Sequence, residues 1–181
     1  MTIPKLLLSR ILNPDEPAPL ACTAIAQIAR NVEYSAESAF EVLLQAFIGD
    51  AREEVERAIL AGAVEIAARA PHADTIARQI DTLRAFRGDR YARFLLYLLS
   101  SKKVPREARG SAAAALATHN ETDLSGPVLI AIEERLQLIL GDAREDTGVQ
   151  RALRTSFGHP RAARPRIHSI AVSRGDETVA L

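Results

Sequence analysis

The chain has 181 residues, of which 48% are hydrophobic and 4% are aromatic, and its formal net charge is zero. A chain of this length and composition buries a hydrophobic core, which excludes disorder of the whole, and the shortage of aromatic residues indicates aliphatic side chains on closely packed helices. The single cysteine, Cys22, excludes an internal disulfide, and no stretch reaches the roughly 20 apolar residues that cross a bilayer. We expect an all-α, soluble, cytoplasmic protein without a signal peptide.

Hydrophobic periodicity and turn residues predict nine helices. Apolar residues recur at helical spacing within each segment, and Gly, Pro, Asp, Ser or Asn bounds each one. The predicted helices span residues 3–12, 19–31, 36–48, 51–69, 73–86, 90–100, 105–118, 124–140 and 143–156. The links between them are short, which is typical of antiparallel helices in a bundle or a stacked array.

Two of the junctions share a hexapeptide. Ile48-Gly-Asp-Ala-Arg-Glu53 is repeated almost unchanged as Leu140-Gly-Asp-Ala-Arg-Glu145, and Gly88-Asp89 is a looser copy. We expect the Gly to take the left-handed conformation that ends one helix, and the Asp, with the Glu three residues later, to cap the next. An anion-binding turn is the functional alternative, but an acidic cap repels a phosphate.

Two segments make specific predictions about the core. Phe40, Leu43, Leu44, Phe47 and Ile48, at the end of the helix predicted over 36–48, lie on one apolar helical stripe. Residues 91–99 are apolar almost all round, so this segment is expected to be the most deeply buried helix.

The predicted helices from residue 19 onward group into hairpins that have the length of helical repeats. These hairpins span residues 19–48, 51–86, 90–118 and 124–156. Within the third, the sequence Val104-Pro-Arg-Glu-Ala-Arg-Gly-Ser-Ala-Ala-Ala-Ala-Leu-Ala117 resembles the HEAT and armadillo-like family of α-solenoids. The family's Pro, small apolar residue, Arg, Ala and Leu places are taken here by Pro105, Ala108, Arg109, Ala112, Ala113, Ala115 and Leu116.

The unit departs from the family pattern in two ways. One extra residue follows Pro105, and Ala108 stands where a Val is usual. The resemblance implies right-handed stacking of helix pairs and a protein-binding surface, and it transfers no catalytic residue. An irregular helical bundle with an Ala-rich interior helix is the alternative architecture.

The composition changes after Phe157. Residues 151–181 hold six Arg against Asp176 and Glu177, a net charge of +4, whereas the other 150 residues carry −4. We therefore divide the chain into an all-helical, repeat-like domain over residues 1–157 and a basic, non-helical tail over residues 158–181. The excess of 20 Arg over 3 Lys in the whole chain is attributed to the coding bias of the source genome.

Three interpretations of the tail remain open. It is a solvated terminus, an arm that docks on its own body or on a neighbouring subunit of a homo-oligomer, or a nucleic-acid-binding segment. The chain has no Lys-rich patch and no interleaved aromatics, so we expect no nucleic-acid binding. The candidate partner-binding residues are Arg161, Arg164 and Arg166.

The sequence contains no motif for catalysis, metal binding or cofactor binding. The four histidines, His72, His119, His159 and His168, are far apart, and every glycine is isolated. We therefore expect a non-enzymatic scaffold or adaptor that binds another protein through its helical surface, without a cofactor. The alternatives are an enzyme or ligand-binding domain whose site is assembled only by the fold, and a nucleic-acid-binding solenoid.

Overall fold

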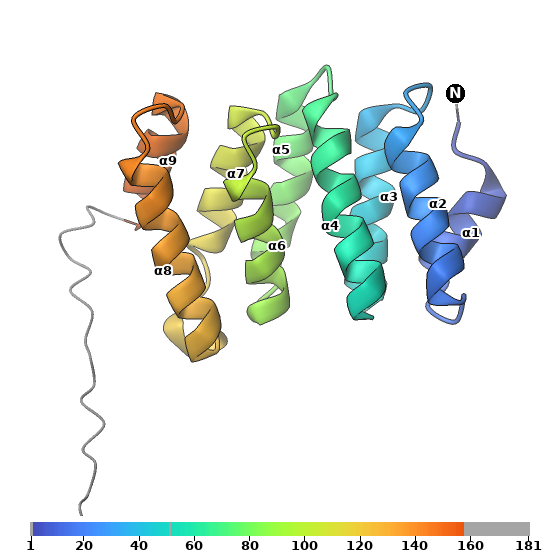
Figure 1. Ribbon diagram of the computed structural model, residues 1–181, viewed down its shortest axis with the longest axis horizontal. Coiled ribbons are helices and arrows are strands. Elements are labelled where there is room, and N and C mark those ends of the chain that lie inside the picture. Colours follow the sequence, from blue (N-terminus) through green and yellow to red (C-terminus); the bar gives the residue numbers. More distant parts are fainter. Residues whose placement is uncertain (1, 51, 158–181) are drawn as a thin grey trace, which may run out of the picture.

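The structure, a computed structural model, describes residues 2–50 and 52–157 (Figure 1). These residues form nine α-helices, two short 3-10 turns and no strand. The elements are α1 (Lys5–Leu12), α2 (Ala18–Arg30), α3 (Ala36–Gly49), α4 (Glu53–Ala68), α5 (Ala73–Asp81), η1 (Thr82–Ala85), α6 (Asp89–Ser100), α7 (Arg106–Leu116), η2 (Glu121–Asp123), α8 (Gly126–Gly141) and α9 (Thr147–Phe157). The predicted tail, residues 158–181, lies outside the described residues.

The predicted all-α fold is confirmed, and two helix ends differ from the prediction by more than two residues. The helix predicted over 73–86 ends at Asp81 and continues as the 3-10 turn η1. The helix predicted to begin at 143 begins at Thr147, because Asp146 caps it. Oδ1 of Asp146 accepts hydrogen bonds from the backbone N–H groups of Gly148 (2.7 Å) and Val149 (3.2 Å).

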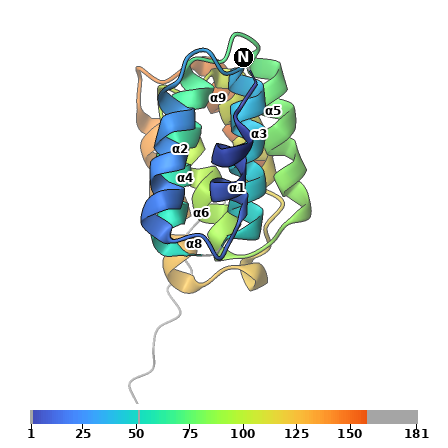
Figure 2. The ribbon, with the colours of Figure 1, turned by 90° about the vertical axis from the view of Figure 1, so that its right-hand side faces the viewer.

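From α2 onward, each helix packs against the helix two places further along the chain. α4 packs against α2 and α6, and α6 packs against α8, while α5 packs against α3 and α7, and α7 packs against α9. The even-numbered helices therefore form one layer, and α3, α5, α7 and α9 form a second (Figures 1 and 2). α1 contacts both helices of the first pair, α2 and α3. Each later pair adds one helix to each layer.

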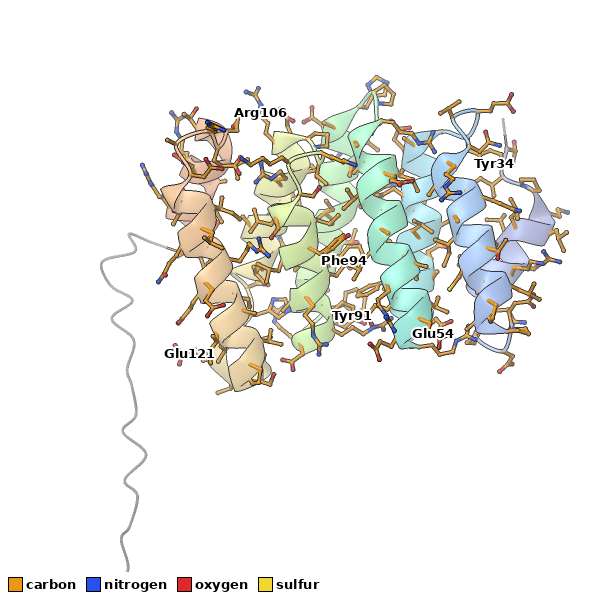
Figure 3. The ribbon with its side chains drawn as sticks, viewed as in Figure 1. Tyr34, Glu54, Tyr91, Phe94, Arg106 and Glu121 are labelled. Atoms are coloured by element: carbon orange, nitrogen blue, oxygen red, sulfur yellow. The ribbon has the colours of Figure 1, made fainter. Side chains whose placement is uncertain are left out.

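The core is aliphatic, as predicted, with one aromatic cluster. Every α-helix contributes at least one buried side chain. The ring centroids of Phe47 and Phe94 are 4.4 Å apart, and Tyr91 meets Phe47 edge-on at 5.5 Å. Figure 3 shows Tyr91 and Phe94 at the boundary between α6 and α4. The cluster therefore joins α3 to α6.

The expected stripe of α3 is buried except at its end. Phe40, Leu43, Leu44 and Phe47 are buried, but Ile48 is 40% exposed, so the buried part of the predicted stripe ends before Ile48. An α-helix turns by about 100° per residue, which places residue 48 roughly 90° from the centre of the stripe. Ile48 therefore lies at the edge of the apolar face rather than on it.

Both hexapeptides separate two helices, but the glycines do not act as predicted. Gly49 and Gly141 are the last residues of α3 and α8, and neither has a positive φ. Among the described residues a positive φ occurs at Gly88 alone, where φ is 104°, and there it precedes α6 instead of ending a helix. The left-handed closure predicted for the hexapeptides is therefore wrong.

The aspartates of the hexapeptides bend the chain instead of capping the next helix. Oδ1 of Asp50 accepts a hydrogen bond from the backbone N–H of Arg52 (2.9 Å), and Oδ1 of Asp142 accepts one from Arg144 (2.8 Å). This contact to the amide two residues on is an Asx turn. The segmentation of the chain at these positions is confirmed, whereas the predicted capping chemistry is wrong.

Arginine side chains bind the carbonyl groups of helix ends. Nε of Arg109 donates to the carbonyl oxygen of Leu99 (2.8 Å) in the last turn of α6, and Arg69 donates to Ile28 (3.3 Å) in the last turn of α2. Arg90 binds the last turn of α3 in the same way. Such carbonyls have no partner within their own helix, and the helix dipole favours a cation there. These arginines have a structural role that coding bias does not explain.

Gly88 has a positive φ and Gly49 does not, so we predict that alanine destabilises the protein at position 88 and has little effect at position 49. We expect Gly88→Ala to lower the free energy of unfolding by about 1–2 kcal/mol, because a Cβ is strained at positive φ. Gly49→Ala is expected to change it by less than about 0.5 kcal/mol, since nothing lies within 4 Å of the added Cβ. Urea unfolding followed by far-UV circular dichroism measures both. Equal losses of stability in the two variants would contradict the claim that only Gly88 needs a positive φ.

Candidate functional site

The buried charges of the described residues form structural contacts. Arg109 and Glu145 are both buried and form a bidentate ion pair, with Nη1–Oε1 at 2.6 Å and Nη2–Oε2 at 2.7 Å. Oε1 of Glu145 also accepts from the backbone N–H of Asp146 (2.8 Å). The hydrogen bonds from Arg109 hold the pKa of Glu145 below its ordinary value. The pair ties α7 to the α8–α9 connection and leaves neither carboxylate oxygen free.

Asp50 is the third buried charged residue, and it is also paired. Its carboxylate binds the guanidinium of Arg52, with both carboxylate oxygens 3.0 Å from Nε. This hydrogen bonding holds the pKa of Asp50 below its ordinary value against the opposing effect of burial. Nη1 of Arg52 reaches on to the carbonyl oxygen of Glu16 (2.5 Å) and so joins the α1–α2 turn to α4.

His119, between α7 and η2, is a half-buried residue whose ring nitrogens point into the protein. Both ring nitrogens are buried and make no hydrogen bond. Burial lowers the pKa of His119 below its ordinary value because it disfavours the charged ring.

The burial of His119 predicts a pH dependence of stability. The unfolded chain binds the proton more readily than the folded one, so the free energy of unfolding is expected to fall as the pH drops below about 6.5. His119→Leu is expected to flatten this dependence between about pH 5 and 7. Urea unfolding at several pH values measures it. Parallel curves for the two proteins would show that His119 does not contribute.

A groove crosses the surface of the even-numbered layer. It has a volume of about 480 Å³ and lies between α4, α6 and α8, and we call it the α6 groove. Its lining residues are Leu60, Arg93, Leu96, Tyr97, Ser100, Ser101 and Arg135. Leu60 and Leu96 are half-buried and pack on the core, while Tyr97 is 45% exposed. The groove therefore has an apolar floor that solvent reaches.

The charges at the α6 groove are all positive. Its lining holds Arg93 and Arg135 and no carboxylate. Arg93 lies 3.9 Å from Asp89, at the limit of an ion pair, and its side chain is 61% exposed. The side chain of Arg135 is exposed and makes no ion pair or hydrogen bond with any residue that the structure describes. Unneutralised positive charge thus borders the apolar floor.

One stripe of α6 supplies most of the groove. Arg93, Leu96, Tyr97 and Ser100 follow the i, i+3, i+4, i+7 spacing that brings residues onto one helical face. Residues 91–99 were expected to form the most deeply buried helix, but this face of α6 departs from that expectation because Arg93 and Tyr97 are exposed. The spacing of these residues was a usable signal in the sequence. The contribution of Arg135 had no such signal, because it depends on the packing of α8 against α6.

The candidate partner-binding residues of the sequence analysis are not part of this groove. Arg161, Arg164 and Arg166 lie outside the described residues. Within residues 2–50 and 52–157, no group of three or more His, Cys, Asp or Glu side chains is placed to hold a metal ion. No helix in that part of the chain is long and apolar enough to span a membrane.

The fold and the groove define an all-α protein whose helix pairs stack in two layers and expose an apolar, basic groove. Comparison with protein-family models, with curated proteins and with solved structures finds no match to this chain.

Proposed function

We propose that this chain is a non-enzymatic scaffold that holds a partner protein in the α6 groove, and that its helix pairs are repeats of the HEAT and armadillo-like kind. The observation that carries the proposal is the exposed Tyr97 ring beside the unpaired Arg135 on an apolar floor. Tyr and Arg are the residue types that contribute most often to the energy of protein interfaces.

The arrangement of helices supports the repeat interpretation. Stacked repeats place each helix beside the equivalent helix of the next pair, as α2, α4, α6 and α8 lie here. In the unit that resembles the family, Ala108, Arg109, Ala112 and Leu116 are all buried. Arg109 also connects two successive pairs through its contacts to α6 and Glu145.

The shape of the groove favours a protein segment over a small molecule. Sites for small ligands are concave and enclose most of the ligand surface. The α6 groove lies on an open helical face, and its arginines and Tyr97 project toward solvent. Grooves between helices commonly take a helix or an extended segment from another protein.

The charge pattern favours a protein partner over a nucleic acid. A nucleic-acid-binding solenoid needs positive charge along its whole face, because each phosphate is neutralised separately. The neighbouring groove between α2 and α4 is lined by Arg30 and Glu65, one charge of each sign. On α4, Arg57 is paired with Glu53 at 3.5 Å. On α2 and α4 these positive charges therefore have acids beside them, whereas the lining of the α6 groove has none.

Site-specific photo-cross-linking tests the proposal. A benzophenone amino acid replaces Tyr97 in the full chain, and the matched control replaces Arg78, an exposed residue of α5 in the other layer. We expect cross-links to one protein in native extract from position 97 only, identified by mass spectrometry and lost when Arg135→Glu is added. Equal yields from both positions, or no effect of Arg135→Glu, would refute binding in this groove.

A further inference from the structure

We infer that the α6 groove takes an acidic segment of the partner, anchored by an aliphatic or aromatic side chain. This inference rests on the proposed function, because it names the chemistry of the protein held in the same groove. Two features of the groove carry it. The first is the positive charge of Arg135, which has no acidic partner, and of Arg93, whose one ion pair is the 3.9 Å contact to Asp89; the second is the exposed apolar floor between them.

The positive charge of the groove is free to pair with a partner. Asp89 is the nearest acid to Arg93, but its carboxylate already accepts hydrogen bonds from the backbone N–H (2.7 Å) and the hydroxyl (2.6 Å) of Ser125. These hydrogen bonds from Ser125 hold the pKa of Asp89 below its ordinary value. Asp89 is thus oriented toward the start of α8, and Arg93 retains exposed N–H donors. Arg135 has all of its donors available.

The apolar floor selects for an anchor residue. Leu60 and Leu96 come from α4 and α6, and the half-exposed ring of Tyr97 stands beside them. An aliphatic or aromatic side chain placed here removes apolar surface of both partners from water. A purely acidic segment would leave this floor exposed, and a purely apolar one would desolvate the unpaired Arg135 and the exposed donors of Arg93. An acidic segment with one anchor satisfies both parts of the groove.

A nucleic acid and the basic part of the chain's own tail fit the groove less well, and a second copy is an outcome of the test. In the chain's own tail, Arg161, Arg164, Arg166 and Arg174 carry the same sign of charge as the groove, and acids occur only at Asp176 and Glu177. A nucleic acid would find a single aromatic ring, Tyr97, on which to stack. A second copy could offer the acidic side of α8, where Ile130 (57% exposed) and Leu138 (65% exposed) lie on the same helix as Glu133 and Glu134.

Selection from a random peptide library provides the test. Peptides of 12 residues are displayed on phage and selected against the immobilised full chain, and the strongest binders are synthesised. We expect them to carry more Asp and Glu than Lys and Arg, together with at least one aliphatic or aromatic residue. The Arg93→Glu/Arg135→Glu variant is expected to bind such a peptide at least about tenfold more weakly.

Two controls separate charge recognition from loss of folding. Arg78→Glu/Arg154→Glu makes the same change of charge on exposed residues of the other layer, and we expect it to keep the affinity within about twofold. A peptide with Lys in place of each Asp and Glu tests the same claim on the unaltered protein and is expected to lose binding. Circular dichroism checks that each variant retains its helical content.

The outcomes distinguish the inference from the proposed function. Neutral or basic peptides whose binding is lost in Tyr97→Ala would overturn the acidic chemistry and leave the groove as the protein-binding site. Peptides that respond neither to Tyr97→Ala nor to the charge reversal would overturn both. Self-association of the chain in sedimentation experiments that disappears in the Arg93→Glu/Arg135→Glu variant would assign the groove to a second copy and would also overturn the inference.

Discussion

Replacing Arg109 with Met is expected to lower the free energy of unfolding by about 3–5 kcal/mol, because it leaves the buried carboxylate of Glu145 without its partner. The same change removes the hydrogen bond to the carbonyl oxygen of Leu99 at the end of α6. Arg109→Met therefore removes one contact within the α6–α7 pair and the ion pair that joins this pair to the α8–α9 connection. Urea or guanidinium unfolding followed by circular dichroism measures the loss.

A double variant separates the missing pair from the missing packing. Arg109→Met/Glu145→Leu buries no charge at this position, so we expect it to recover a large part of the stability lost in Arg109→Met. Arg57→Ala is the surface control, since its ion pair with Glu53 is mostly exposed, and it is expected to cost less than about 1 kcal/mol. A loss for Arg109→Met no larger than for Arg57→Ala would contradict the structural role of the buried pair.

The same pair predicts a response to acid. Because Arg109 holds the pKa of Glu145 below its ordinary value, the stabilisation is complete above the pKa of a free carboxyl group. It is lost as the pH falls through the lowered pKa of the folded state, where the carboxylate becomes protonated. Arg109→Met/Glu145→Leu is therefore expected to lose less stability than the wild-type chain when both are acidified.

Phe47→Ala is expected to have an effect of similar size, about 3–5 kcal/mol, through loss of packing. The ring is fully buried, meets the rings of Phe94 and Tyr91, and lies 4.3 Å from the guanidinium carbon of Arg90. Its removal leaves a cavity where α3 meets α6 and takes away the aromatic surface beneath Arg90.

The neighbouring Ile48 provides a matched control for this prediction. Ile48 precedes the same junction but is 40% exposed, so Ile48→Ala is expected to cost about 1 kcal/mol or less. Thermal unfolding and urea unfolding compare the two variants. Similar losses at both positions would show that the aromatic cluster does not hold α3 and α6 together.

The stability predictions concern residues of the interior, whereas the functional proposal concerns residues of the surface. Arg109, Glu145 and Phe47 lie inside the stack, whereas Arg93, Tyr97 and Arg135 lie on its even-numbered face. Exposed residues of this kind change the free energy of unfolding little. Charge reversal in the groove is therefore expected to alter binding while the helical content and stability are retained. The groove variants thus serve as controls for the stability variants, and the stability variants as controls for the groove variants.

The sequence by itself determined the helices and most of their buried faces. Periodicity, Pro and Gly-Asp junctions are local signals, so the breaks at Asp50 and Asp142 were predicted correctly, as were the buried positions of Phe40 and Leu43. The conformation of Gly49 was not predicted correctly, because the same short sequence is compatible with both a left-handed and an ordinary helix end.

The tertiary structure alone decided what each repeated motif and each arginine contacts. Glu53 and Glu145 hold the same place in two copies of one hexapeptide, yet Glu53 is exposed and Glu145 is buried against Arg109. The groove likewise joins Leu60, Tyr97 and Arg135, which are separated by 37 and 38 positions in the sequence. Local propensity specifies which residues become helical, but only the packing of one helix pair on the next brings such distant side chains within reach of one another.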